Sequence, residues 1–207
     1  MKEIVIELVF HNRGLRSYIE ADLCLNCPRQ DQKGCCGLYS PVFYPTDLAY
    51  ILQENRQVID DIFSFNDITV LDYSVTLNND PDDTGYRCKF HTLDAGCKLP
   101  QHLRESICRH FVCPGISWWT EAALAPWKKF FEALEAYELA VNNRISDGLK
   151  QKNLSLRKPE HRDSFYRELC SLFQEETKQL PEFIEKFPQQ EKYILKRKID
   201  LQSEWPL

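Results

Sequence analysis

The sequence predicts an α+β fold that is predominantly helical, with cysteine-rich loops, a short β element and a C-terminal helical scaffold. Three observations lead to this fold class. Eight of the nine cysteines fall in two groups of four before residue 114. A strand-like alternation of apolar residues lies near the N-terminus, and helical spacing of apolar residues begins near residue 120.

The composition is that of an ordinary globular protein. Hydrophobic residues make up 43% of the 207-residue chain, aromatic residues 12% and charged residues 28%, so the chain can bury a core without crosslinks. No repeat, low-complexity tract or linker divides it. We therefore expect a single domain over residues 1–207, with a cysteine-cluster region at about 24–115 and a helical region at about 118–200.

The charge of the chain limits its partners. A net charge of −5 argues against a nucleic-acid partner, because such proteins present a basic face to phosphates. The basic run at 192–198 has a helical pattern and is interpreted as a solvated helix face. No stretch has the roughly 18 uninterrupted apolar residues of a membrane span, and Glu3 and Glu7 interrupt the apolar stretch that a signal peptide needs. We expect a cytoplasmic protein with no membrane association.

Two segments have the character of β-strands. Residues 3–10 alternate in the period-two pattern of a strand with one buried face. Residues 67–77 are rich in β-branched and aromatic residues and predict a second strand. The sequence NNDPDDTG at 78–85 then predicts a turn. The alternating apolar residues of the first strand are Ile4, Ile6, Leu8 and Phe10.

Helical spacing predicts four helices. A short helix is capped by Thr46 or Asp47. The longest helix begins after Thr120, with Pro126 in its opening turn or kinking that turn. Segments 161–180 and 181–201 predict two more helices, and Pro188 interrupts the second of them. The apolar face of the longest helix consists of Leu124, Trp127, Phe131, Leu134, Val141 and Ile145.

Cysteine is the outlier of the composition. The first group has the spacing Cys-x2-Cys-x7-Cys-Cys, and after a gap of fifty-one residues the second has Cys-x8-Cys-x10-Cys-x4-Cys. In a reducing compartment dense thiols are more often metal ligands than disulfides, and four thiolates can complete a shell around zinc or hold an iron–sulfur cluster. Disulfides and unrelated buried thiols are the alternatives. The eight candidate metal ligands are Cys24, Cys27, Cys35, Cys36, Cys88, Cys97, Cys108 and Cys113.

Other residues near the thiols have two interpretations each. Arg109 either offsets the negative charge of a four-thiolate site or forms a surface salt bridge. His91, His102 and His110 are expected to be exposed loop residues, with replacement of a sulfur ligand as the alternative. Cys170 lies on the apolar side of a later helix and is expected to be a small buried hydrophobe.

The cysteine pattern, together with PVFYPTDLAYIL at 41–52 and CKFHTLDAGCKLPQHLRESICRHFVC at 88–113, resembles the zinc- or iron-chelating cysteine-cluster family, also called YkgJ-like. The resemblance covers about residues 24–115. The chain departs from the family pattern in its longer spacing from Cys27 to Cys35 and in Glu105, which stands where the family has proline and is expected to alter only a helix start. The matching residues besides cysteine are Val42, Phe43, Asp47, Phe90, Arg104, Arg109 and Phe111.

The resemblance implies chelation of a metal by the eight cysteines. Some members of the family are thought to hold an iron–sulfur cluster in proteins linked to lysine methylation of flagellin. We therefore expect a metal-binding protein that coordinates zinc or an iron–sulfur cluster, with a subunit or relative of an iron–sulfur protein lysine methylase as the alternative. No catalytic residue is assigned, and whether the protein is an enzyme stays open. A metal ion is the expected partner; a protein partner bound through Trp118 and Trp119 is a further option, against their packing as lids of the core.

Overall fold

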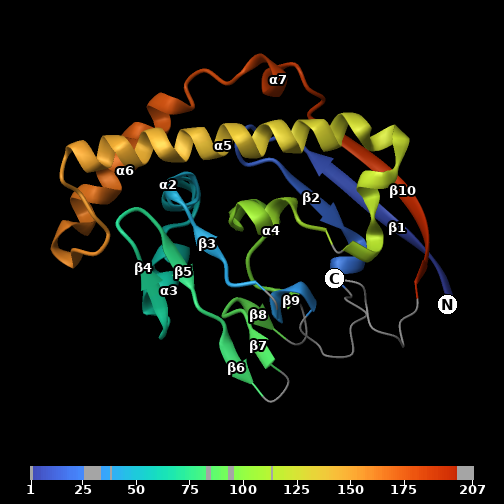
Figure 1. The fold of residues 1–207 in the computed structure, drawn as a ribbon, viewed down its shortest axis with the longest axis horizontal. Coiled ribbons are helices and arrows are strands. Elements are labelled where there is room, and N and C mark those ends of the chain that lie inside the picture. The colour runs from blue at the N-terminus through green and yellow to red at the C-terminus, as the bar shows by residue number, and fades with distance from the viewer. Residues whose placement is uncertain are drawn as a thin grey trace.

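The fold is that of a computed structural model, which describes residues 2–25, 34–37, 39–82, 85–92, 96–112 and 114–199. Figure 1 shows a long helix, α5, that runs across the molecule above a set of smaller elements, with a three-stranded sheet near one of its ends. About half of the described residues are helical, and the strands form several small antiparallel sheets. The α+β class is therefore confirmed.

The larger sheet is built around β1 (Lys2–His11), which lies between its two neighbours. Leu8 and Phe10 are fully buried, whereas Val5 on the opposite face is 57% exposed. This is the alternation that the sequence predicts for a strand with one buried face, so the first strand prediction is confirmed. The neighbours, both antiparallel to β1, are β2 (Tyr18–Ala21) and β10 (Gln190–Ile199).

The C-terminal segment differs from its prediction. Instead of a helix interrupted at Pro188, the chain forms the short helix α7 (Glu182–Glu185) and then the ten-residue strand β10. The basic run at 192–198 is therefore part of a strand, and the predicted helical region ends before it. Leu195 is buried while Ile194 is 49% exposed, which is the period of a strand. β10 pairs with β1 along its whole length, and this pairing favours a strand over a helix. Strand formation depends on the neighbouring strand more than on local sequence.

The predicted long helix is α5 (Ala125–Gln151), and Pro126 stands in its first turn, where the missing proline N–H costs no hydrogen bond. The ring of Trp127 stacks on that of Phe10 with 5.1 Å between centroids, which joins the helix to the sheet through aromatic contacts. α6 (Arg162–Glu176) packs against α5. The buried residues on its predicted face are Phe165, Leu169 and Phe173.

The segment from 42 to 77 contains two corrections. The Tyr44 N–H donates to the Asp47 carboxylate over 3.1 Å, so the helix begins after Tyr44 and the predicted caps lie inside its first turn. The predicted strand at 67–77 is a hairpin, because a turn in which the Leu71 N–H donates to the Ser74 carbonyl over 2.9 Å divides it. The elements are β3 (Val42–Phe43), α2 (Pro45–Glu54), α3 (Arg56–Ser64), β4 (Ile68–Val70) and β5 (Val75–Leu77), with sheet order β3-β5-β4.

The cysteine region is made of short elements. Residues 80–82, inside the predicted turn, pair as one strand of a hairpin, and residues 83 and 84 lie outside the described part of the chain. The elements are α1 (Asp22–Leu25), β6 (Asp80–Asp82), β7 (Gly85–Arg87), β8 (His91–Thr92), β9 (Gly96–Cys97) and α4 (Ser106–His110), with 3₁₀ turns at η1 (Gly34–Gly37), η2 (Gln101–Leu103), η3 (Pro114–Ile116), η4 (Trp118–Thr120), η5 (Ala122–Leu124) and η6 (Pro159–His161).

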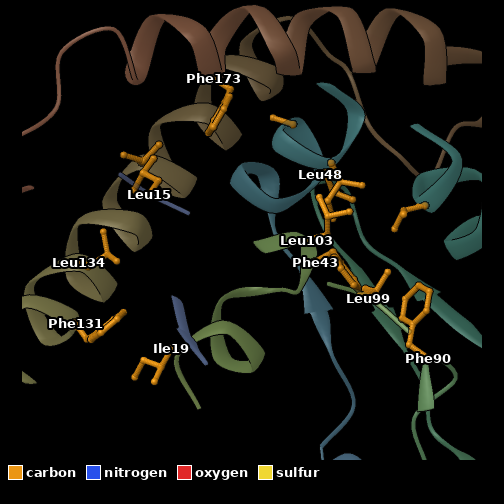
Figure 2. Close-up of a cluster of buried hydrophobic side chains, with 14 of the residues drawn as sticks. Leu15, Ile19, Phe43, Leu48, Phe90, Leu99, Leu103, Phe131, Leu134 and Phe173 are labelled. Atoms are coloured by element: carbon orange, nitrogen blue, oxygen red, sulfur yellow. The ribbon is translucent and has the colours of Figure 1, made fainter. Parts of the chain in front are cut away.

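One cluster of buried apolar side chains connects these parts. Figure 2 shows it running from Phe131 and Leu134 of α5 to Phe43 of β3 and Leu99 of the cysteine region. The division into one domain stays a prediction. Among the described residues, no helix is long and apolar enough to cross a membrane.

Candidate metal centre

The described residues include the side chains of half of the eight candidate ligands. Cys24 lies in α1 and Cys35 in η1, while Cys27 and Cys113 lie outside the described residues. The four remaining candidates are Cys36, Cys88, Cys97 and Cys108, and we call them the thiol site.

A backbone contact joins the first cysteine group to the second. The Cys88 N–H donates to the Cys36 carbonyl over 2.9 Å, although fifty-one residues separate them. The Asn79 side-chain amide also reaches this segment, donating to the carbonyl of Tyr39 over 3.1 Å and to that of Cys36 over 3.4 Å. The fold therefore brings together the two groups that the spacing pattern predicted to act together.

Cys88 and Cys97 lie around one short hairpin. The His91 N–H donates to the Cys88 carbonyl over 2.9 Å, and His91 is the pairing partner of Cys97 between β8 and β9. The Lys98 N–H donates to the Phe90 carbonyl over 2.8 Å and extends the same hairpin. Cys88 is buried and Cys97 half-buried. The bond from His91 to Cys88 and the pairing of β8 with β9 therefore hold two sulfur-bearing residues near one another.

Cys108 is presented by the first turn of α4. The Glu105 carboxylate accepts hydrogen bonds from the Cys108 N–H over 2.7 Å and from the Ile107 N–H over 3.0 Å. These two bonds cap the helix, so Glu105 does alter the helix start, as its place in the sequence predicted. The cap fixes the backbone that carries the sulfur of Cys108.

The electrostatics of Cys108 indicate that three thiols are neighbours. Burial is the main cause that raises the pKa of the Cys108 thiol, and the Glu105 carboxylate, Cys97 and Cys88 raise it further. Burial, Glu105 and Cys108 likewise raise the pKa of Tyr39. Charges act in this way over short range, so Cys88, between β7 and β8, and Cys97, in β9, lie in the vicinity of Cys108 in α4.

The proximity of thiols does not by itself make a metal site. Within the part of the chain that the structure describes, no group of three or more His, Cys, Asp or Glu side chains is arranged to hold a metal ion. The donor chemistry nevertheless suits a soft or borderline cation, because thiolates are the ligands that zinc and iron–sulfur clusters take. The ligation of a metal by the eight cysteines stays a prediction.

Arg109 is the clearest correction among the site residues. It is fully buried, and its Nη2 donates to both oxygens of Glu138 over 2.7 and 2.9 Å. Its Nη1 donates to the carbonyls of Leu15 over 3.0 Å and Ser17 over 2.8 Å. The surface salt bridge is therefore wrong. The side chain pairs with a carboxylate of α5, so its charge is offset there instead of by thiolates.

A second buried arginine extends this arrangement. Arg16 Nη1 lies 2.5 Å from the Asp47 carboxylate, and its Nη2 donates to the carbonyls of Arg104 over 2.6 Å and His102 over 2.9 Å. Burial is the largest cause that lowers the pKa of Arg16. We call Arg16, Asp47, Arg109 and Glu138 the buried charge network.

The sequence interpretation missed Arg16 and Glu138. A signal for Glu138 exists, because it lies four residues after Leu134 and three before Val141, on the apolar face of the longest helix. An acidic residue at such a position is buried only with a partner. No comparable local signal marks Arg16, whose partners are far away in sequence.

The comparisons with known proteins add nothing further. Neither the protein-family models, nor the curated proteins, nor the solved structures contain a match to this chain. The likeness to the cysteine-cluster family therefore rests on the residue pattern alone.

The remaining predicted residues are placed as follows. His91, His102 and His110 are all partly buried instead of exposed. Burial, with the charge of Arg109, lowers the pKa of His110 to about 3. Cys170 is half-buried on α6, so it is less buried than the small buried hydrophobe that the sequence predicts. Trp118 is buried as predicted for a lid of the core, whereas Trp119 is 38% exposed.

Proposed function

We propose that the protein is a metal-binding protein in which the eight cysteines Cys24, Cys27, Cys35, Cys36, Cys88, Cys97, Cys108 and Cys113 coordinate zinc or an iron–sulfur cluster. One observation supports this most strongly. Cys88 and Cys97 lie close enough to Cys108 to help raise the pKa of its thiol, and a main-chain hydrogen bond joins Cys36 to Cys88.

The chemistry of such a cluster favours a cation. Burial is the main reason why the thiol of Cys108 holds its proton, and the nearby Glu105, Cys97 and Cys88 add to the rise in its pKa. A bound cation would reverse this balance, because metal coordination deprotonates a thiol outright. Without a cation, clustered cysteine side chains would pack no better than alanine or valine at the same positions.

The scaffold around the thiol site supports the same function. Glu105 caps the turn that carries Cys108, and the next residue, Arg109, anchors that turn to α5 through Glu138. A ligand held by such contacts keeps its position when the metal is absent, and this preorganisation strengthens binding. The buried charge network is thus the support of the site and not its counterion.

Elemental analysis of freshly purified protein tests the proposal. We expect about one metal ion or more per chain, and loss of most of it in Cys108→Ser. Cys170→Ser is the matched control, because Cys170 is half-buried and lies outside both cysteine groups. Equal metal content in wild type and Cys108→Ser, or only traces in both, would show that the thiol site is not a metal site.

The same preparation distinguishes the two metals. Protein isolated without oxygen that carries an iron–sulfur cluster absorbs visible light at about 400 nm, whereas zinc protein is colourless. Four thiolates suit either metal centre. Iron and sulfide in equal amounts, with this absorbance, identify the cluster; zinc alone identifies the structural ion.

A further inference from the structure

The outward face of the larger sheet carries its charges in separate rows. On β10 the outward residues are Lys192, Ile194, Lys196 and Lys198, which are all exposed. On β1 the outward residues are Glu3, Val5, Glu7 and Val9. On β2, Glu20 pairs with Val9 and faces the same way. One edge of this face is therefore cationic and the rest acidic.

These rows are only partly neutralised within the chain. Lys192 Nζ lies 2.5 Å from the Glu7 carboxylate, but among the described residues Lys196, Lys198 and Glu3 form no ion pair. Between the charges lie Val5, 57% exposed, and Ile194, 49% exposed. The face thus combines unpaired charge of both signs with two of the most exposed apolar side chains of the described chain.

We propose that this face binds the same face of a second copy of the chain. A two-fold axis parallel to the strands sets the β10 row of one protomer over the β1 row of the other. Because Lys198 pairs with Glu3 across the strands, both stand at the same height, so each Lys198 meets the partner copy's acidic row. The apolar residues Val5 and Ile194 then lie at the centre of the contact. Such an isologous interface is self-complementary in charge.

The dimensions of the face make this dimer a weak one. Ten residues at about 3.3 Å and the two overlapping strands at about 4.8 Å span roughly 33 by 10 Å, so stacking buries at most roughly 650 Å² in total. This area is typical of transient complexes. Exposed ion pairs add little each and are screened by salt, so association depends on ionic strength.

Pairing of two copies through the free edge of β10 is the less favourable mode. Two β10 strands side by side would place Lys192, Lys196 and Lys198 of one copy next to those of the other. Lysine on an edge strand is a known device against such pairing. Stacking of faces brings opposite charges together, whereas edge pairing brings like charges together.

Sedimentation equilibrium over about 10–500 μM at about 50 mM salt tests the proposal. Wild type should approach twice the mass of one chain, and salt at about 1 M should weaken its association about tenfold or more. Two variants should each lose self-association about tenfold: Lys196→Glu with Lys198→Glu, and Glu3→Lys with Glu7→Lys. Circular dichroism checks that both remain folded.

The decisive arm mixes the two variants. One variant has a mainly acidic face, with Lys192 unchanged, and the other a mainly basic face, with Glu20 unchanged, so the mixture should associate again, within about threefold of wild type. The pair Lys158→Glu and Lys178→Glu, exposed and outside the sheet, is the matched control and should leave wild-type association unchanged. A monomer at every concentration, or a dimer that the mixture does not restore, overturns the proposal. Neither outcome depends on metal binding.

Discussion

At the scale of single residues, Arg109 shows that the support of the thiol site depends on a buried ion pair. Its guanidinium and the Glu138 carboxylate are both buried and form two hydrogen bonds. A buried pair of this kind adds little net stability compared with an apolar pair, but removal of one partner leaves the other charged and unsolvated. The two residues therefore depend on one another strongly.

Arg109→Met should lower the free energy of unfolding by about 3–5 kcal/mol, because Glu138 is left without its partner. Arg144→Met is the matched control, since Arg144 makes a single 2.7 Å contact with Glu176 at the surface, and it should cost less than about 1 kcal/mol. Urea denaturation followed by circular dichroism measures both. Equal losses in the two variants would contradict the importance of burial.

Glu138 should also give the protein a specific pH dependence. Burial alone raises the pKa of Glu138, but Arg109, Arg16 and His110 together outweigh it and hold the pKa below its ordinary value of 4.5. A carboxyl with a lowered pKa stabilises the fold above its unfolded pKa and loses this contribution as the pH falls. Glu138→Gln should therefore be less stable than wild type at neutral pH, and the gap should narrow below about pH 4.5. Urea denaturation from neutral to acid pH measures the gap; a constant gap would contradict the cause.

The cysteines and their surroundings differ in how far the sequence could predict them. The spacing of the thiols drew attention to both cysteine groups, because ligands of one site are recognised by type and repetition, and a main-chain hydrogen bond does join Cys36 of the first group to Cys88 of the second. The sequence could not predict that Arg109 pairs with Glu138. That choice depends on where α5 packs, and α5 begins seventeen residues after Cys108.

At the scale of elements, periodicity predicted β1, α5 and α6 but not β10. In β1 the period-two alternation of apolar residues has no competing helical pattern. In β10 the neighbours Tyr193, Ile194 and Leu195 are all apolar and have basic residues on both sides, so the segment suits a helix and a strand alike. Only the pairing with β1, nearly two hundred residues away in sequence, resolves this ambiguity.

Two neighbouring substitutions in β10 test the strand directly. Leu195→Ala should lower the free energy of unfolding by about 2–5 kcal/mol, because Leu195 is 2% exposed and the change leaves a cavity. Ile194→Ala, on the exposed face, should cost less than about 1 kcal/mol. Urea denaturation measures the two variants. Similar costs at both positions would contradict a strand with one buried face.

At the scale of the whole molecule, the core and the thiol site have different sources of stability. β1 and α5 bury aromatic rings against one another, among them Phe10 and Trp127. The cysteine region contains strands of two or three residues and a five-residue helix. Such short elements need support from elsewhere, which the proposed metal supplies.

Removal of the metal should therefore loosen only one part of the protein. After treatment with a chelator, amide hydrogen exchange should become faster within residues 85–99, because their local unfolding no longer costs the free energy of metal binding. α4, which Arg109 anchors to α5, should change less. Exchange in β1, β10 and α5 should change little. Mass spectrometry of peptides measures both regions in one sample, and uniform acceleration over the chain would contradict this division.

The ligands of the metal decide whether the thiol site is what we propose. X-ray absorption at the edge of the bound metal measures the first coordination shell in the purified protein. We predict a shell of sulfur alone, at about 2.3 Å if the metal is zinc. A shell of nitrogen and oxygen at about 2.0–2.2 Å would show that the cysteines do not hold the metal, and the proposed function would be wrong.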